Sequence, residues 1–221
     1  MRKTLLTVGC LFLLCLCRGQ DSKWSITFTP AIVQAPYLCY GIQPGVEYRF
    51  NERFSLLTEF AFTTSKSKDL FYSNNKFFRV KPELRYTLRD SDDGLRAYTG
   101  FQVSYSYRGW QDNSGGMYYE KKMYADSVVA FDKAHINSSI LTWSVQLGTP
   151  FSFGNHLGMD IFMGLGMRFI FTNYSDVQNG VKDARARRIC TAFPVPDPAF
   201  NVDGTVTRFH SNFGIRFFYR F

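Results

Sequence analysis

The segment FFRVKPELRYTL, residues 77–88, decides how this chain folds, because its side chains alternate in character with a period of two. One parity is apolar and the other is mostly charged: Phe78, Val80, Leu84, Tyr86 and Leu88 against Arg79, Lys81, Glu83 and Arg85. Successive side chains of a strand point to opposite faces, so the pattern predicts a β-strand with one apolar and one charged face. Pro82 lies on the apolar parity and lacks an N–H group, which predicts a bulge or a gap in the ladder.

Seven further runs show the same alternation, whereas the helical period finds no comparable support. They lie near residues 24–34, 40–50, 54–64, 95–108, 136–149, 157–172 and 209–221. Each run reaches the roughly 9 to 11 residues that a tilted strand needs to cross a bilayer. We therefore predict an all-β fold, a single antiparallel up-and-down transmembrane barrel of about eight strands.

The connections between these runs alternate in length. Short links are expected near residues 51–53, 89–94 and 150–156, and long or irregular links near 35–39, 65–76, 109–135 and 173–206. If both termini lie on the inner side, every short turn lies there too and every long loop lies outside. This asymmetry is typical of outer-membrane barrels.

The first residues, MRKTLLTVGCLFLLCLCRGQ, have the order and size of a secretory signal. We predict a signal peptide over residues 1–19 and a barrel domain over residues 20–221. A lipoprotein signal is the alternative, because Cys15 and Cys17 end the apolar run; each follows a leucine where lipid attachment favours a small residue. No later segment is long and apolar enough for a membrane helix, so a membrane location requires a closed barrel.

Charge and cysteine content exclude some function classes. The formal charge of +8 includes three cations of the leader, which contains no acidic residue, so the rest of the chain has only a mild excess of positive charge. It has no basic stripe of the kind that binds nucleic acid. Three of the five cysteines belong to the leader. Cys39 and Cys190 remain, near the first and fourth outer loops, and a disulfide between them is one hypothesis and two unpaired thiols the other. No metal site and no cofactor is expected.

Periodicity alone does not say which face looks outward, because a soluble lipocalin-like barrel alternates in the same way. Glycines on the polar parity and aromatic residues near strand ends favour a narrow interior and a lipid-facing exterior. The segment FGIRFFYRF, residues 213–221, adds a third feature: Phe213, Ile215, Phe217, Tyr219 and Phe221 alternate up to a terminal aromatic. It resembles the signal by which the barrel-assembly machinery recognises its clients; the alternative is an ordinary final strand.

Over the mature chain this organisation resembles the small eight-stranded, porin-like outer-membrane barrels of Gram-negative bacteria, of the OmpA and OmpX types. The resemblance implies a location in the cell outer membrane, with its lipid and lipopolysaccharide as partners. The long fourth loop and Pro82 depart from the simplest members. The resemblance is one of pattern and brings no functional motif.

The polar parity predicts a dense set of mixed charges inside the barrel. Its members are Glu47, Arg49, Glu59, Arg79, Lys81, Glu83, Arg85, Arg96, Asp160, Arg168, Arg216 and Arg220. The interior of eight strands is only wide enough to be filled by side chains, and unpaired buried charges are costly. We expect a plug of salt bridges, with a gated proton or ion path as the alternative; because arginine outnumbers acid, any conductance should favour anions.

The two longest loops carry residues suited to contact with a partner, since aromatic and arginine side chains dominate interface energetics. The candidates are Trp110, Tyr118, Tyr119, Arg185, Arg187 and Arg188. They could bind an extracellular ligand, a surface polysaccharide or a surface protein, and the arginines could hold lipopolysaccharide phosphates. The alternative is a solvated loop without a partner.

The sequence favours a non-enzymatic barrel with a structural or surface-interaction role. A narrow pore for small solutes is the main alternative. A lipid-modifying enzyme is a weaker one, because the only histidines are His135, His156 and His210. Ser211 follows His210, but adjacent strand residues face opposite sides and cannot form a nucleophile and base pair. No nucleotide, zinc or phosphate-loop motif occurs.

Overall fold

The computed structural model describes residues 23–35, 37–65, 72–88, 97–113, 115–120, 128–183 and 201–221. The described residues form strands joined by turns, with no α-helix. The strands are β1 (Trp24–Ala35), β2 (Tyr37–Arg49), β3 (Phe54–Ser65), β4 (Tyr72–Thr87), β5 (Tyr98–Asp112), β6 (Gly116–Glu120), β7 (Val128–Phe131), β8 (Lys133–Phe153), β9 (Leu157–Gln178), β10 (Val181–Asp183) and β11 (Val202–Arg220). None of the described segments is a helix that could cross a bilayer.

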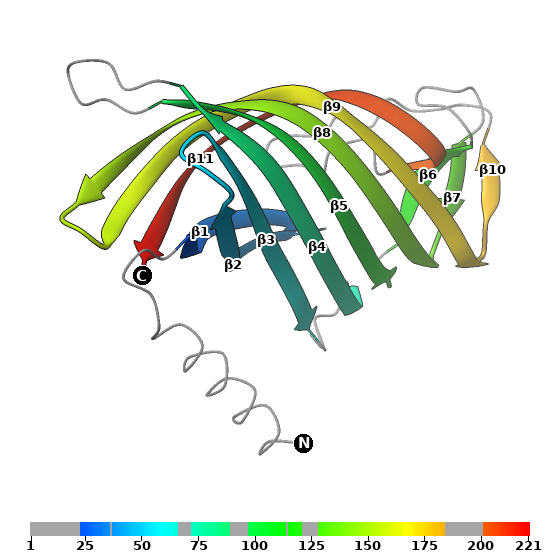
Figure 1. Cartoon of the computed structure of the whole chain (residues 1–221). Coiled ribbons are helices and arrows are strands. Elements are labelled where there is room, and N and C mark those ends of the chain that lie inside the picture. Colours follow the sequence, from blue (N-terminus) through cyan, green and yellow to red (C-terminus); the bar gives the residue numbers. More distant parts are fainter. Residues whose placement is uncertain are drawn as a thin grey trace.

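Eight of these strands form a closed antiparallel ring (Figure 1). Their order is β1-β2-β3-β4-β5-β8-β9-β11, and β11 returns to pair with β1 through Ser25↔Arg220 to Phe28↔Phe217. The predicted all-β fold and its eight strands are confirmed. We call the end of the ring that holds Trp24 and Arg220 the turn side, and the opposite end the loop side.

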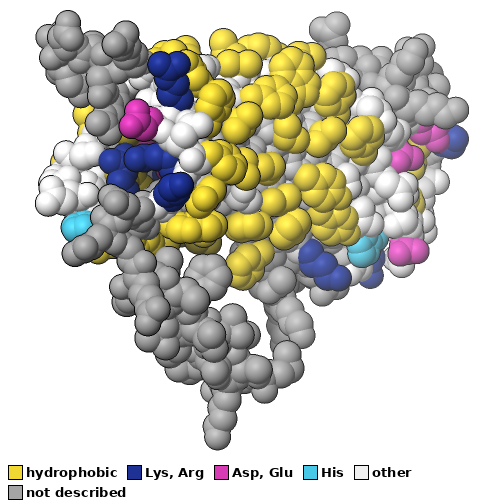
Figure 2. Space-filling view, in the orientation of Figure 1, with side chains coloured by type: hydrophobic (Ala, Val, Ile, Leu, Met, Phe, Trp, Pro, Cys, Tyr) yellow, Lys and Arg dark blue, Asp and Glu magenta, His cyan; other side chains and the backbone are white. Residues whose placement is uncertain are grey.

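The alternation in the sequence decides which side chains the ring encloses. In β5, the interior-facing Gln102 is 3% exposed and its neighbour Phe101, on the outer face, is 50% exposed. The outer parity of the other ring strands carries the exposed hydrophobic residues, and Figure 2 shows them as a broad apolar band between two more polar ends. The interior parity carries the buried charged and hydroxyl side chains.

Aromatic rings fill the interior where the facing strand offers a glycine. Tyr98, Phe162 and Phe218 point inward, and each is paired in register with a glycine on the neighbouring strand: Gly148, Gly214 and Gly158. A Cβ atom added to these glycines would lie 2.1 to 2.5 Å from the ring. The glycines therefore leave the space that the rings occupy, a pairing known to support strands at such positions.

Two of the predicted short links, at residues 51–53 and near residues 154–156, are tight turns on the turn side. Between β2 and β3, Asn51 Oδ1 accepts hydrogen bonds from the backbone N–H groups of Arg53 and Phe54, at 2.9 and 2.8 Å. Between β8 and β9, Gly154 has a φ of 85°, which favours glycine. These local features fix two tight turns.

Two features of β1, β2 and β4 refine the sequence prediction. The prediction of a long link near residues 35–39 was wrong, since pairing continues to Ala35↔Tyr37 and only one residue separates the two strands. β-prone residues on both sides extend the ladder to the bend.

At Pro82 the β4–β5 ladder is interrupted between Val80↔Tyr105 and Glu83↔Gln102, without a shift of register. The proline therefore makes a gap rather than a bulge.

The third and fourth links are also more ordered than predicted. β5 continues to Asp112 and β9 to Gln178, and β11 already begins at Val202. The short strands β6, β7 and β10 pair with each other and with the start of β11, in the order β11-β6-β7-β10. We call these three strands with Val202 and Asp203 the cap sheet; it lies at the loop-side end of β8 and β9 (Figure 1).

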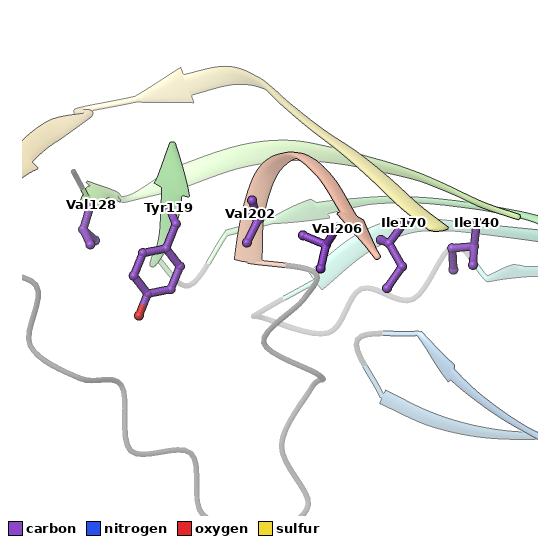
Figure 3. Packing of buried hydrophobic residues seen from close by; sticks show 6 residues of the cluster. All are labelled: Tyr119, Val128, Ile140, Ile170, Val202 and Val206. Atoms are coloured by element: carbon purple, nitrogen blue, oxygen red, sulfur yellow. The ribbon is translucent and has the colours of Figure 1, made fainter. Parts of the chain in front are cut away.

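The cap sheet packs against the interior parity of the ring strands, which becomes apolar at this end. Tyr119, Val128 and Val202 of the cap lie in one cluster with Ile140, Ile170 and Val206 of the ring (Figure 3). A second cluster combines cap and ring residues: Tyr118, Val129 and Phe131 with Trp110, Ala134 and Ile136. Burial of each large apolar side chain contributes about 1.5–3 kcal/mol, so these clusters hold the cap in place.

Candidate functional site inside the ring

The turn-side half of the interior is built around Arg216 of β11, which is fully buried. Its Nε and Nη2 atoms donate to the two carboxylate oxygens of Glu59 at 3.0 and 3.1 Å. Nη1 donates to Asp160 Oδ2 at 2.7 Å, and Nη2 also contacts Glu83 Oε2 at 3.3 Å. Four strands thus meet at one guanidinium, whose planar fork suits several carboxylates.

A second cation, Arg85 of β4, contacts two of the same acids and one more. Its Nε donates to Glu83 Oε1 at 2.8 Å and its Nη2 to Asp160 Oδ2 at 3.0 Å. Its Nη1 lies 3.5 Å from Glu47 Oε1. Lys81 Nζ completes the group at 2.6 Å from Glu59 Oε2. We call these seven residues the ion-pair network: Glu47, Glu59, Lys81, Glu83, Arg85, Asp160 and Arg216.

Neutral side chains add hydrogen bonds to the same carboxylate oxygens that the cations contact. Tyr98 OH donates to Asp160 Oδ2 at 2.9 Å, Gln102 Nε2 donates to Glu83 Oε2 at 3.2 Å, and Thr29 donates to Glu59. Ser55 Oγ donates to Glu47 Oε1 at 2.6 Å. Buried charges are tolerated when they are paired and hydrogen-bonded in this way. The network therefore fills the turn-side half as a connected polar core.

The inward aromatic rings lie against the cations of this half. The guanidinium carbon of Arg216 lies 4.4 Å from the ring centre of Phe162, and that of Arg85 lies 4.4 Å from Tyr98. Arg220, nearer the turn side, lies 4.5 Å from the ring of Phe218. Such cation–π contacts are favourable by about 0.5–2 kcal/mol and hold the guanidinium planes in place.

The middle of the interior holds a cavity of about 390 Å³ on the loop side of the network. Its lining includes four cationic side chains, Arg79, Lys81, Arg108 and Arg168, together with His210. The remaining polar lining residues are Thr29, Gln43, Gln102, Ser104, Ser106, Thr142 and Asn212. No Asp or Glu belongs to the described lining.

The structure distributes the predicted interior charges over three places. Seven form the ion-pair network, Arg79 and Arg168 line the cavity, and Arg220 lies near the turn side. Arg49 was expected inside, but it is exposed at the turn-side end of β2, where the strand leaves the ring. Arg96 lies outside the described residues.

The loop residues predicted to contact a partner differ more from expectation. Trp110, Tyr118 and Tyr119 are 7%, 9% and 5% exposed, because they form the apolar clusters beneath the cap sheet. That part of the prediction is wrong. Arg185, Arg187 and Arg188 lie outside the described residues, as do residues 1–19. Cys39 pairs in register with Val33, but Cys190 is not among the described residues either.

The structure also places the alternating residues at the end of the chain and the histidines. Phe213, Ile215, Phe217 and Tyr219 lie on the outer face of β11 and are exposed, and Phe221 follows the strand. Of the histidines, His156 lies in the β8–β9 turn and His135 in β8. The described residues contain no group of three His, Cys, Asp or Glu side chains that could hold a metal ion.

Sequence reasoning missed His210, Arg108, Arg208 and the inward aromatic rings. Arg168 Nη2 lies 2.8 Å from His210 Nδ1, and both residues line the cavity. The parity that placed Arg216 and Arg220 inside also covers Arg208, His210 and Phe218. A stricter reading of that signal would have found them.

The family described as Protein of unknown function (DUF3575) matches residues 35–192. The matched span contains β2 to β10 and therefore six of the seven residues of the ion-pair network, all but Arg216. No curated protein and no solved structure matches the chain. Because the match covers well over half of the 221 residues, the chain belongs to the DUF3575 family.

Proposed function

We propose that the protein is an outer-membrane β-barrel that holds a filled interior in the bilayer and displays its cap sheet and outer loops at the cell surface. Its role is that of a structural or interaction scaffold. The observation that carries this proposal is the inverted distribution of side chains. Arg216 and Glu59 are fully buried inside the ring, whereas Leu165 and Phe213 are 60% and 72% exposed outside it.

This distribution favours lipid as the medium around the ring. Soluble proteins rarely expose apolar patches larger than a few hundred Å², and the apolar band of Figure 2 extends across the ring strands. Aromatic side chains gather at its turn-side border: Trp24 packs on Tyr48 at 4.6 Å between ring centres, and Phe54 packs on Tyr86 at 5.1 Å. Aromatic girdles of this kind mark the interfaces of membrane barrels.

The interior favours a scaffold over an open pore or an enzyme. The ion-pair network fills the turn-side half with paired charges, and the cavity of about 390 Å³ lies on the loop side of this network. His210 contacts Arg168 on the interior face, while Ser211 is exposed on the opposite face. A serine–histidine pair between these neighbours has no geometric basis.

The surface role rests on the loop side. The cap sheet is a folded platform rather than a pair of loose loops, and its rim adjoins the third and fourth links. Lipopolysaccharide and surface molecules are the partners that such a platform would meet. In the cell, the barrel-assembly machinery would recognise the alternating aromatic residues of β11.

The experiment is to refold the chain from Gln20 onward in detergent and into lipid vesicles, and in buffer without either. With detergent or lipid vesicles we expect the folded protein to migrate differently on gels before and after heating. We expect vesicles to protect it from protease, and neither effect in plain buffer. A monomer that folds and stays soluble in plain buffer would overturn the membrane proposal. Planar-bilayer recording of the refolded protein should be silent, and steady channels would favour the narrow pore instead.

A further inference from the structure

The described lining of the cavity inside the ring carries several cationic side chains and no acidic one. Arg79, Arg108 and Arg168 line it from β4, β5 and β9, and Lys81 connects it to Glu59 of the network. The acids of the network lie on its turn side, and no Asp or Glu belongs to the described lining. These cations come from three strands and converge on one space, whatever further contacts each of them makes within the protein.

Cationic side chains lie close together at the cavity. Arg79 and Arg168 lie within electrostatic reach of each other, and His210 lies within reach of Arg168, Arg79 and Lys81. Arg208 lies directly opposite Arg168 in the β9–β11 register and adds a further cation on the interior face. A phosphate group in the cavity would be attracted by several guanidinium groups at once.

The neutral lining residues supply donors as well. A guanidinium can only donate, so Arg168 Nη2 donates to His210 Nδ1 at 2.8 Å, which leaves the proton of the neutral imidazole on Nε2. In the same way, Ser106 Oγ accepts from Arg79 Nε at 3.0 Å, and its own hydroxyl proton can be donated elsewhere. Such donors suit the oxygens of a phosphate group.

Two acceptors in the lining of the cavity point to more than a bare anion. Gln43 Oε1 and Asn212 Oδ1 are buried side-chain oxygens without a hydrogen-bond partner among the described residues, and both residues line the cavity. Buried polar atoms are normally satisfied. A hydrogen phosphate ion has one hydroxyl group to donate to these oxygens, whereas a ligand with several hydroxyl groups can donate to both.

We propose that the cavity binds a small phosphate monoester that carries hydroxyl groups, of the size of a hexose phosphate. The arginines would bind the phosphate group, and Gln43 and Asn212 would accept hydrogen bonds from the hydroxyl groups. The volume of about 390 Å³ falls within the range of roughly 300–1,000 Å³ that is usual for small-molecule sites.

The test is a calorimetric titration of residues 20–221 with glucose 6-phosphate, inorganic phosphate and glucose. We expect saturable binding of glucose 6-phosphate at least tenfold tighter than that of either other probe. Arg168→Gln and Arg79→Gln should each weaken it at least tenfold. Arg49→Gln is the matched control, since it removes the same charge from an exposed position outside the cavity and should change affinity less than twofold. Asn212→Leu should reduce the preference for the ester over inorganic phosphate.

Three results would overturn the inference: no saturable binding of glucose 6-phosphate, equal affinity of the cavity variants and Arg49→Gln, or equal affinity for the ester and inorganic phosphate. Circular dichroism of each variant verifies its fold, and the two arginine variants are independent of each other. The titration can be made in detergent or in buffer, because the cavity lies inside the ring in either medium. Its outcome is therefore separate from that of the membrane proposal.

Discussion

Arg216 and Glu59 form a two-point ion pair in the interior of the ring, with N–O distances of 3.0 and 3.1 Å, although 157 residues separate them in the chain. Neither side chain is exposed. The pair links β11 to β3 across the interior, and both strands also belong to the closed ladder. This contact therefore joins distant parts of the ring through its polar core.

Arg216→Met should destabilise the folded ring strongly. The change leaves Glu59, Glu83 and Asp160 without their shared cation, and breaking a buried pair costs about 3–5 kcal/mol. Urea unfolding monitored by tryptophan fluorescence measures the loss. Arg49→Gln, at an exposed position, is the control and should lie within about 0.5 kcal/mol of the wild type. Equal stability of the two variants would contradict the importance of the network.

Gly214→Val should destabilise the protein by about 1–3 kcal/mol through overpacking. The added atoms would meet the ring of Phe162, which lies 2.5 Å from the position of the new Cβ and supports Arg216. Adding Phe162→Ala should make the double variant more stable than the sum of the two single changes predicts. Simple additivity would show that the two residues do not share this space.

Leu165→Lys discriminates between lipid and water around the ring. Leu165 is 60% exposed on the outer face of β9, so a soluble ring would tolerate the change. In a membrane, lysine near the middle of the lipid face costs about 2–4 kcal/mol. Val181→Lys, at a 62% exposed position on the cap sheet, should cost little. Folding into vesicles measures both, and a neutral Leu165→Lys would speak against lipid contact.

Trp110→Ala should loosen the cap sheet while the ring persists. Trp110 is 7% exposed and packs with Tyr118 and Phe131, and truncation of a buried tryptophan costs about 3–5 kcal/mol. Hydrogen exchange should accelerate in β6, β7 and β10 and remain slow in β3 and β4. Trp143→Ala, on the outer face of β8, is the matched control. Accelerated exchange throughout the ring would show that the cap is not a separate unit.

Alkaline pH should loosen the cap sheet through Tyr118. Burial raises the pKa of Tyr118 above its ordinary value of 10.0, and the nearby Asp203 and Glu120 raise it further. Because the folded state holds this proton more tightly than the unfolded state, its contribution is complete below pH 10 and is lost as the pH rises beyond it. Hydrogen exchange in β6 of Tyr118→Phe should therefore depend less on pH than in the wild type. Identical pH profiles of the two proteins would contradict this role.

The ring itself could be predicted from the sequence because one rule operates in all eight strands. The alternation around Phe78 and Arg79 assigns each residue to a face, and the same rule applies from β1 to β11. Which acid meets which base could not be predicted, because Arg216 and Glu59 meet only once every strand has its register. Arg49 shows the limit of parity at a strand end, where the inward direction no longer leads into the ring.

The cap sheet escaped prediction for two physical reasons. β7 and β10 have four and three residues, too few for a period to be visible. An aromatic residue in a link also looks the same whether it contacts a partner or packs inward. Trp110 was nevertheless on the parity of Ser106 and Arg108, and continuing that parity past Arg108 would have placed it on the interior face.

The parallel pairing of Val202 with Tyr119 makes one segment of the chain necessary for two sheets. The rest of β11 pairs with both β9 and β1. A truncation before residue 202 would thus leave three open edges at once, on β1, β6 and β9. Unpaired strand edges are templates for aggregation. A chain shortened in this way should therefore fail to fold altogether and be degraded by proteases, rather than form a partly functional molecule.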